Sequence, residues 1–186
     1  MSEKGVDANY RFIAAYQEVN ARIVQRHQAL TLYVTLTASL LAGLFALHPG
    51  ESSRQLPVEW LVFAFPVTTV CLAFLNYKTE RAITNLRSFL ASLERIANAH
   101  HQLPSYNTDP RWSSGVNKVR RFHDYAAAVL ASGANAIGIG TVLRLYPERL
   151  ADRPLLTGVL VVAALLSILA LLVIPRWSYQ PPAEAS

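Results

Sequence analysis

The side chains that could support catalysis or metal binding are few and scattered along the sequence. None of the histidines lies at a metal-ligand spacing such as His-x-x-x-His, and the adjacent pair at 100 and 101 would point about 100° apart on a helix. The single cysteine, Cys71, excludes a disulfide or a cysteine-based metal site within one chain. No nucleophile or phosphate-loop motif is present, so we expect a protein that is not an enzyme and binds neither metal nor cofactor. The histidines are His27, His48, His100, His101 and His123.

The distribution of charge predicts the elements that position these residues. The chain is 52% hydrophobic and only 16% charged, whereas soluble domains have about 25% charged residues. Each of four windows without Asp, Glu, Lys or Arg has the roughly 17–25 residues that an α-helix needs to cross a bilayer. We therefore predict an all-α, polytopic membrane protein whose four transmembrane helices form two antiparallel hairpins. The windows are residues 28–47, 60–77, 125–143 and 154–175.

The Lys and Arg residues predict the orientation of these helices. Thirteen of the seventeen fall in the N-terminal segment, the segment between the second and third windows, and the tail. Since short loops rich in Lys and Arg stay on the cytoplasmic side, we expect both termini and the middle segment to be cytoplasmic, at the plasma (inner) membrane. This topology explains the pI near 9.6 without a nucleic-acid partner.

Two polar segments are predicted to form cytoplasmic amphipathic helices. Phe12, Tyr16, Val19 and Ile23 recur at helical spacing within residues 8–27. In residues 77–101 the apolar stripe needs burial against the first helix, another subunit or a soluble partner. A loop at 102–116 and a short basic helix at 116–124 then lead into the third window. The proposed partner-binding positions in that stripe are Ile83, Leu86, Leu90 and Leu93.

The chain therefore divides into five segments. These are a cytoplasmic N-terminal helix (1–27), a first membrane hairpin (28–77), a cytoplasmic segment with an amphipathic helix, a loop and a basic lead-in (78–124), a second membrane hairpin (125–175) and a disordered tail (176–186).

The third window is built from residues that lipid barely favours. Ala131, Ala134 and Gly138 share one helical face, with Asn135 at its edge. Because lipid gives helices no hydrophobic reason to associate, such a face allows close backbone packing, and Asn135 supplies an interhelical hydrogen bond. The first window has a similar small and polar face, which predicts that windows one and three lie inside the bundle or at an oligomer interface, and that windows two and four face lipid. In an oligomer, Asn135 could instead line a pore opposite the hydroxyl groups of Thr31, Thr35 and Ser39.

Two functions of different classes fit this pattern. The first is a homo-oligomeric, channel-like or membrane-perturbing effector whose cytoplasmic helices respond to a partner or ligand. Its layout is similar to that of small multi-span effectors of prokaryotic defence systems, although no specific motif supports this likeness. The second is a membrane anchor that recruits a soluble protein through the 77–101 helix. A coupled transporter is disfavoured because no window has an ionisable residue near its centre. Residues expected at lipid head groups are Lys118, Arg120 and Arg121.

Overall fold

The computed structural model describes residues 7–47, 58–96, 99–105 and 107–181. This part of the chain contains helices and no strands, and four of the helices are long and apolar enough to cross a membrane. The all-helical prediction and its four apolar helices are thus confirmed. The elements are α1 (Ala8–Ala46), α2 (Val58–Glu94), α3 (Ala99–Gln102), α4 (Pro110–Leu145), α5 (Pro147–Ala151), α6 (Pro154–Val173) and the 3₁₀ turn η3 (Ile174–Trp177).

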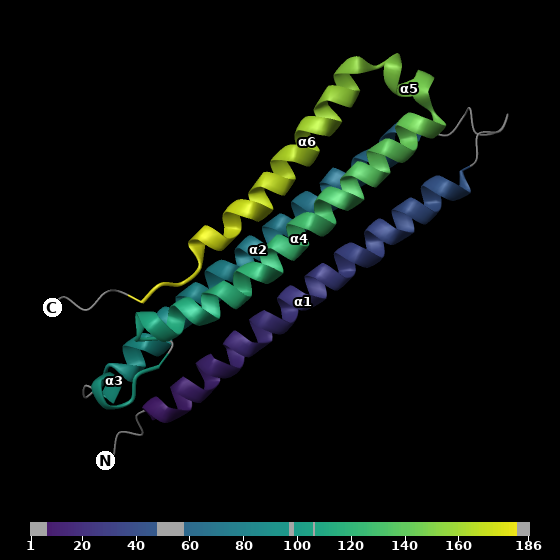
Figure 1. Ribbon diagram of the computed structural model, residues 1–186. Coiled ribbons are helices and arrows are strands. Elements are labelled where there is room, and N and C mark those ends of the chain that lie inside the picture. The colour runs from purple at the N-terminus through teal and green to yellow at the C-terminus, as the bar shows by residue number, and fades with distance from the viewer. Residues whose placement is uncertain (1–6, 48–57, 97–98, 106, 182–186) are drawn as a thin grey trace.

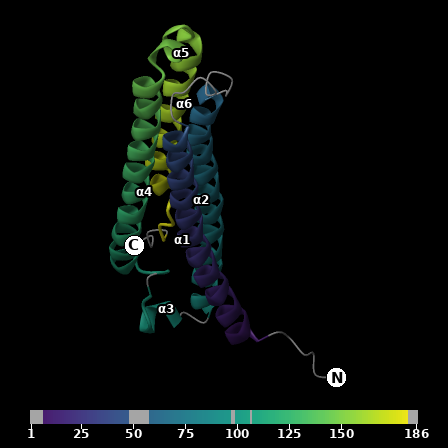
Figure 2. The same ribbon diagram turned by 90° about the vertical axis from the view of Figure 1, so that its right-hand side faces the viewer.

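The four long helices lie side by side along one direction (Figures 1 and 2). The short helices mark the two ends of the bundle, with α3 at one end and α5 at the other. We call these the α3 end and the α5 end. Helices α1 and α4 begin at the α3 end, where α2 and α6 finish. Segments far apart in the sequence therefore meet at the α3 end.

Helix α1 is a single helix of 39 residues. The Asp7 carboxylate caps it by accepting a hydrogen bond of 3.1 Å from the Asn9 amide. No glycine or proline follows until Gly43, so nothing in the sequence interrupts the helix between its polar and apolar parts. Helix α2 is similarly long and continues through Pro66. Both helices therefore extend beyond their apolar windows as one piece.

Helix α2, and not α1, is the centre of the bundle. It contacts α1, α4 and α6, whereas α1 rests mainly on α2. Within the most apolar window, 39% of α2 is buried, against 17% of α1. Within the chain, the expectation that windows one and three lie inside while two and four face outward is therefore wrong for the first two windows: the second is the most buried of the four and the first is the least. The reason is size: Phe65 of α2 needs a recess, and the small residues of α4 provide one.

The core divides into three clusters along the bundle. Near the α5 end, Phe65 and Val62 of α2 pack with Leu44, Val142 and Leu160. In the middle, Leu72 and Tyr33 pack with Ala131 and Leu171, and near the α3 end Ile83 and Leu90 pack against Ala15 and Val19 of α1. The apolar stripe of the 77–101 segment is thus covered by α1 within the same chain.

Two local expectations differ from the structure. Helix α4 begins at Pro110, within the expected loop, because Asp109 caps it and proline is well suited to the first helical turn. The Arg111 amide donates to the Asp109 carboxylate at 2.8 Å. The tail, expected to be disordered from residue 176, is packed as far as Tyr179, whose side chain is buried.

Gly138 generates a prediction about packing. A Cβ atom at this position would lie 2.8 Å from the Phe65 ring, closer than carbon atoms approach. We expect Gly138→Ala to lower the free energy of unfolding by about 1–3 kcal/mol, measured by denaturant titration in detergent micelles. Gly140→Ala is the matched control, because nothing lies within 4 Å of its Cβ position. Equal losses in the two variants would contradict this packing.

Candidate functional site

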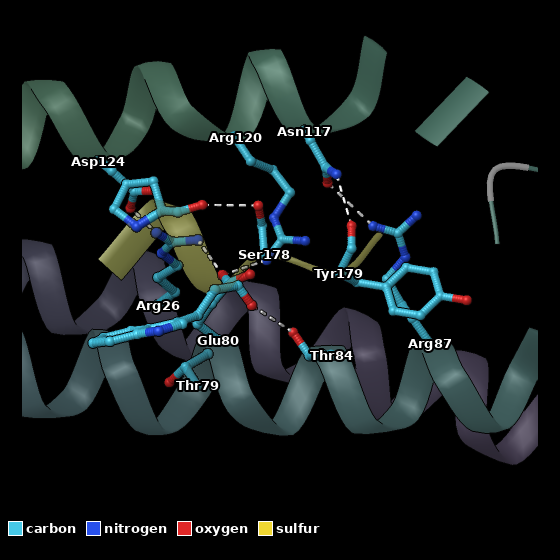
Figure 3. Close-up of polar contacts among 12 residues, drawn as sticks. Arg26, Thr79, Glu80, Thr84, Arg87, Asn117, Arg120, Asp124, Ser178 and Tyr179 are labelled. Carbon is cyan, nitrogen blue, oxygen red and sulfur yellow. Dashed lines mark hydrogen bonds and ion pairs between the residues drawn. The ribbon is translucent and has the colours of Figure 1, made fainter. Parts of the chain in front are cut away.

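Four charged side chains from three helices meet inside the bundle. Arg26 of α1 pairs with Glu80 of α2 at 3.2 Å and with Asp124 of α4, and Arg120 of α4 pairs with the same Glu80 carboxylate. The side chains of Arg26, Glu80 and Asp124 are at most 6% exposed. We call these four residues the junction cluster, and Figure 3 shows how they converge.

The sequence places all four members just outside the charge-free windows. Arg26 comes before the first window, Glu80 follows the second, and Arg120 and Asp124 precede the third. Because the helices lie side by side, these window edges fall at one level of the bundle. Two cations and two anions are therefore brought together with no net charge. Such balance is required, since an unpaired charge buried among helices is strongly destabilising.

Two histidines lie beside the junction cluster. The rings of His27 and His123 meet edge to face, with centroids 4.9 Å apart. Burial lowers the pKa of His123, and the positive charges of Arg26 and His27 lower it further. His123 is thus held neutral near pH 7. Its protonation on acidification would oppose folding, because the folded state then binds a proton less readily than the unfolded chain.

A second polar layer lies further toward the α3 end. The Arg87 guanidinium donates to the side-chain oxygens of Asn107 at 3.2 Å and Asn117 at 3.3 Å, and lies 4.8 Å from the centre of the Tyr179 ring. Asn117 donates to the Tyr179 carbonyl, and the Tyr179 hydroxyl donates to the Asn107 carbonyl, each at 2.8 Å. This layer attaches the loop before α4 and the segment after η3 to α2 (Figure 3).

A third polar group crosses the apolar part of the bundle. The Asn135 amide donates to the Thr69 hydroxyl at 2.9 Å and to the Ala131 carbonyl at 2.8 Å. The Thr69 hydroxyl also lies 3.2 Å from the Tyr33 hydroxyl. This chain connects α4, α2 and α1. Asn135 therefore makes an interhelical hydrogen bond, as the first of the two interpretations of the sequence predicted. Its partner, Thr69, belongs to α2.

The remaining predicted site residues divide between the interior and the surface. Ala131 and Gly138 are buried, and Ala134 is half-buried beside them. The α1 hydroxyl residues point away from the bundle, so the structure does not bring them to Asn135. Each donates to the carbonyl four residues earlier in α1, at 2.9–3.1 Å. These exposed residues are Thr31, Thr35 and Ser39.

The predicted partner-binding and head-group residues are also separated. Ile83 and Leu90 are buried, and Leu86 and Leu93 are half-buried. Lys118 is exposed and Arg121 half-buried, whereas Arg120 belongs to the junction cluster. Arg120 is therefore engaged with protein, and the expectation that it serves lipid head groups does not fit its position.

The described residues include no group of three or more His, Cys, Asp or Glu side chains able to hold a metal ion. His48 lies outside these residues. Comparison with known proteins finds no matching family model, no similar characterised protein and no similar solved structure.

The junction cluster was missed by reasoning on the sequence, although a signal existed. Glu80 and Asp124 are acidic residues in an otherwise basic region at the window edges. An acidic residue there has no role in orienting a membrane helix, so it suggests pairing with a nearby Arg. Only the structure shows that Arg26 and Arg120, among the many basic residues near the windows, are the partners of Glu80.

The junction cluster generates a prediction about stability. Glu80→Gln leaves Arg26 and Arg120 close together without the carboxylate they share. We expect the free energy of unfolding to fall by about 3–5 kcal/mol, as when one partner of a buried pair is removed. Glu18→Gln is the control, because Glu18 forms an exposed pair with Arg22 on one helix, worth about 0.5 kcal/mol or less. A Glu80→Gln effect as small as the control would contradict the arrangement.

The Asn135–Thr69 hydrogen bond generates a second prediction. A double-mutant cycle of Asn135→Leu and Thr69→Val should give a coupling energy of about 0.6 kcal/mol, within the range up to about 1.7 measured between membrane helices. Thr68→Val provides the matched cycle, because the Thr68 hydroxyl donates to the Phe65 carbonyl of its own helix. Equal coupling in both cycles would show that the interhelical bond does not form.

Proposed function

We propose that the protein is an integral membrane protein of the plasma (inner) membrane, with its four apolar windows spanning the bilayer as two antiparallel hairpins. The α3 end, where α1 begins and near which most of the Lys and Arg residues of the described chain lie, is then cytoplasmic. Large apolar side chains on the outside of the windows support this, because water would disfavour them and lipid would not. Examples are Phe74, Val129, Leu155 and Leu166, each more than 60% exposed.

Within that class, we infer a homo-oligomeric channel-like or membrane-perturbing effector. The observation that carries this inference is that α1 is the least buried of the four long helices and is one continuous helix from its polar N-terminal part through its apolar window. Its outward face has a row of hydroxyl residues, and Ser and Thr are enriched where membrane helices pack closely against one another. Around the axis of an oligomer, Thr31, Thr35 and Ser39 would line a water-filled path.

The cytoplasmic parts of α1 and α2 would be the control element of such an effector. Arg26 is the one α1 side chain in the junction cluster, and it holds α1 to both α2 and α4. Below it, Ala15 and Val19 cover Ile83 and Leu90. A ligand or partner that separated these surfaces would free α1 from the other helices and uncover the stripe of α2.

The alternative function, a membrane anchor that recruits a soluble protein, is favoured by a different surface from the one expected. The stripe of residues 83, 86 and 90 is occupied by α1, whereas Tyr16 and Ile23 of α1 are 42% and 37% exposed. A partner could dock on this side of α1 as on an amphipathic helix. No enzymatic reaction, cofactor or nucleic-acid partner is part of either proposal.

The two functions differ in whether water reaches Thr35. In a Cys71→Ser background, which removes the exposed native thiol, we expect the Thr35→Cys variant in liposomes to react with a charged methanethiosulfonate. The reaction should also change the rate of dye release, because the added charge lies in the conducting path.

Leu166→Cys is the matched control, since Leu166 is 61% exposed on α6 and would face lipid, where the charged reagent does not enter. An unreactive Thr35→Cys variant together with no dye release would favour the anchor. Equal reactivity at both positions would contradict the proposed membrane span itself.

A further inference from the structure

A groove with both apolar and basic side chains in its lining lies between α1 and α2 at the edge of their apolar windows. It has a volume of about 290 Å³, several times the roughly 30 Å³ that one water molecule occupies in the liquid. Its lining changes character along the bundle. The charged groups come from residues outside the windows, whereas Leu32 lies about one turn inside the first window and Leu75 two residues inside the second. The lining includes Arg22, Gln25, Gln28, Leu32, Leu75 and Lys78.

The two charged residues that line this groove are both basic, and Glu18, outside the lining, pairs with Arg22. Arg22 and Lys78 come from different helices, and no acidic residue lines the groove. Lys78 is exposed and has no ion-pair partner among the residues that the structure describes. Arg22 is oriented by Glu18, which accepts from Nε at 3.0 Å, and by Gln25, which accepts from Nη1 at 3.1 Å. Because a guanidinium has five N–H donors, Arg22 keeps donors for a further acceptor.

We propose that this groove binds the head group of an anionic phospholipid, with the acyl chains running along Leu32 and Leu75 into the bilayer. The site rests on the proposed membrane span. Lys78 and Arg22 would donate to the phosphodiester oxygens, and the exposed amides of Gln25 and Gln28 would reach the glycerol part. A phosphate on a lipid fits better than a free anion, because Leu32 and Leu75 are 55% and 45% exposed directly below the basic groups.

The position of the groove also gives the lipid a structural effect. Arg22 and Gln25 lie within one turn of Arg26, which points into the junction cluster on the inner side of α1. Lys78 lies two residues before Glu80 on α2. A lipid bridging Arg22 and Lys78 would therefore join the same two helices on the outer side that Arg26 and Glu80 join on the inner side.

Native mass spectrometry of the protein tests this site. The protein is taken from vesicles of equal parts phosphatidylglycerol and phosphatidylcholine, and retained lipids are counted. We expect the wild type to retain phosphatidylglycerol preferentially. Each of Arg22→Gln and Lys78→Gln should reduce that preference about fivefold, as expected for one basic residue at an anionic surface. Arg81→Gln is the control, because Arg81 is exposed on α2 and does not line the groove, and its replacement removes the same single positive charge.

The other outcomes are decisive. Equal loss in the control and the groove variants would show that only total charge matters and would overturn the site. Displacement of phosphatidylglycerol by added inorganic phosphate would overturn the lipid assignment and leave a simple anion site. Wild-type protein washed from the vesicles by alkaline carbonate would refute the membrane span, whereas protein that stays but shows no lipid preference would refute this site alone. Lys78 makes no hydrogen bond or ion pair among the described residues, so Lys78→Gln removes none from the folded protein.

Discussion

The structure depends on one carboxylate, Glu80, which two arginines from different helices share at the window edges. These charges can be buried because Asp124 supplies a second carboxylate, which pairs with Arg26. The two arginines and two carboxylates together have no net charge. Neutrality of this kind favours one register of the helices, since sliding any of the three by a turn would leave a charge without its counterion. The apolar surfaces alone are less selective, because similar aliphatic side chains can pack in several registers.

Close packing in the apolar part follows a different rule, which is complementarity of size. Phe65 fits against Gly138, and the larger side chains of α2 face the alanines of α4. The hydrogen bond from Asn135 to Thr69 adds a directional interaction to a contact between helices that otherwise depends on the shapes of the side chains. The small residues of α4 are therefore used within the chain, whereas those of α1 remain on the outside and are available for contacts between copies.

Composition and charge spacing were sufficient to predict four apolar helices, because the length and hydropathy of each window are properties of a single segment. The arrangement of the helices was not predictable in the same way. A helix face of small residues predicts that another helix packs closely against it, but it does not identify Phe65 of α2 as the neighbouring side chain. Pro110 shows a similar limit, since proline occurs both in loops and in first helical turns, and only the cap by Asp109 distinguishes them. Tyr179 was missed because its partners, Arg87 and Asn117, are remote in sequence.

The length of α1 on either side of Arg26 has a mechanical consequence. At 1.5 Å per residue, the helix extends about 27 Å from Arg26 back to Ala8 and about 30 Å forward to Ala46. Were its packing on α2 released on both sides while Arg26 stayed paired, α1 would act as a rigid rod that pivots near its middle, with two nearly equal arms. A sideways displacement of the first turns would then be reproduced, in the opposite direction and at almost the same amplitude, at the far end of the helix.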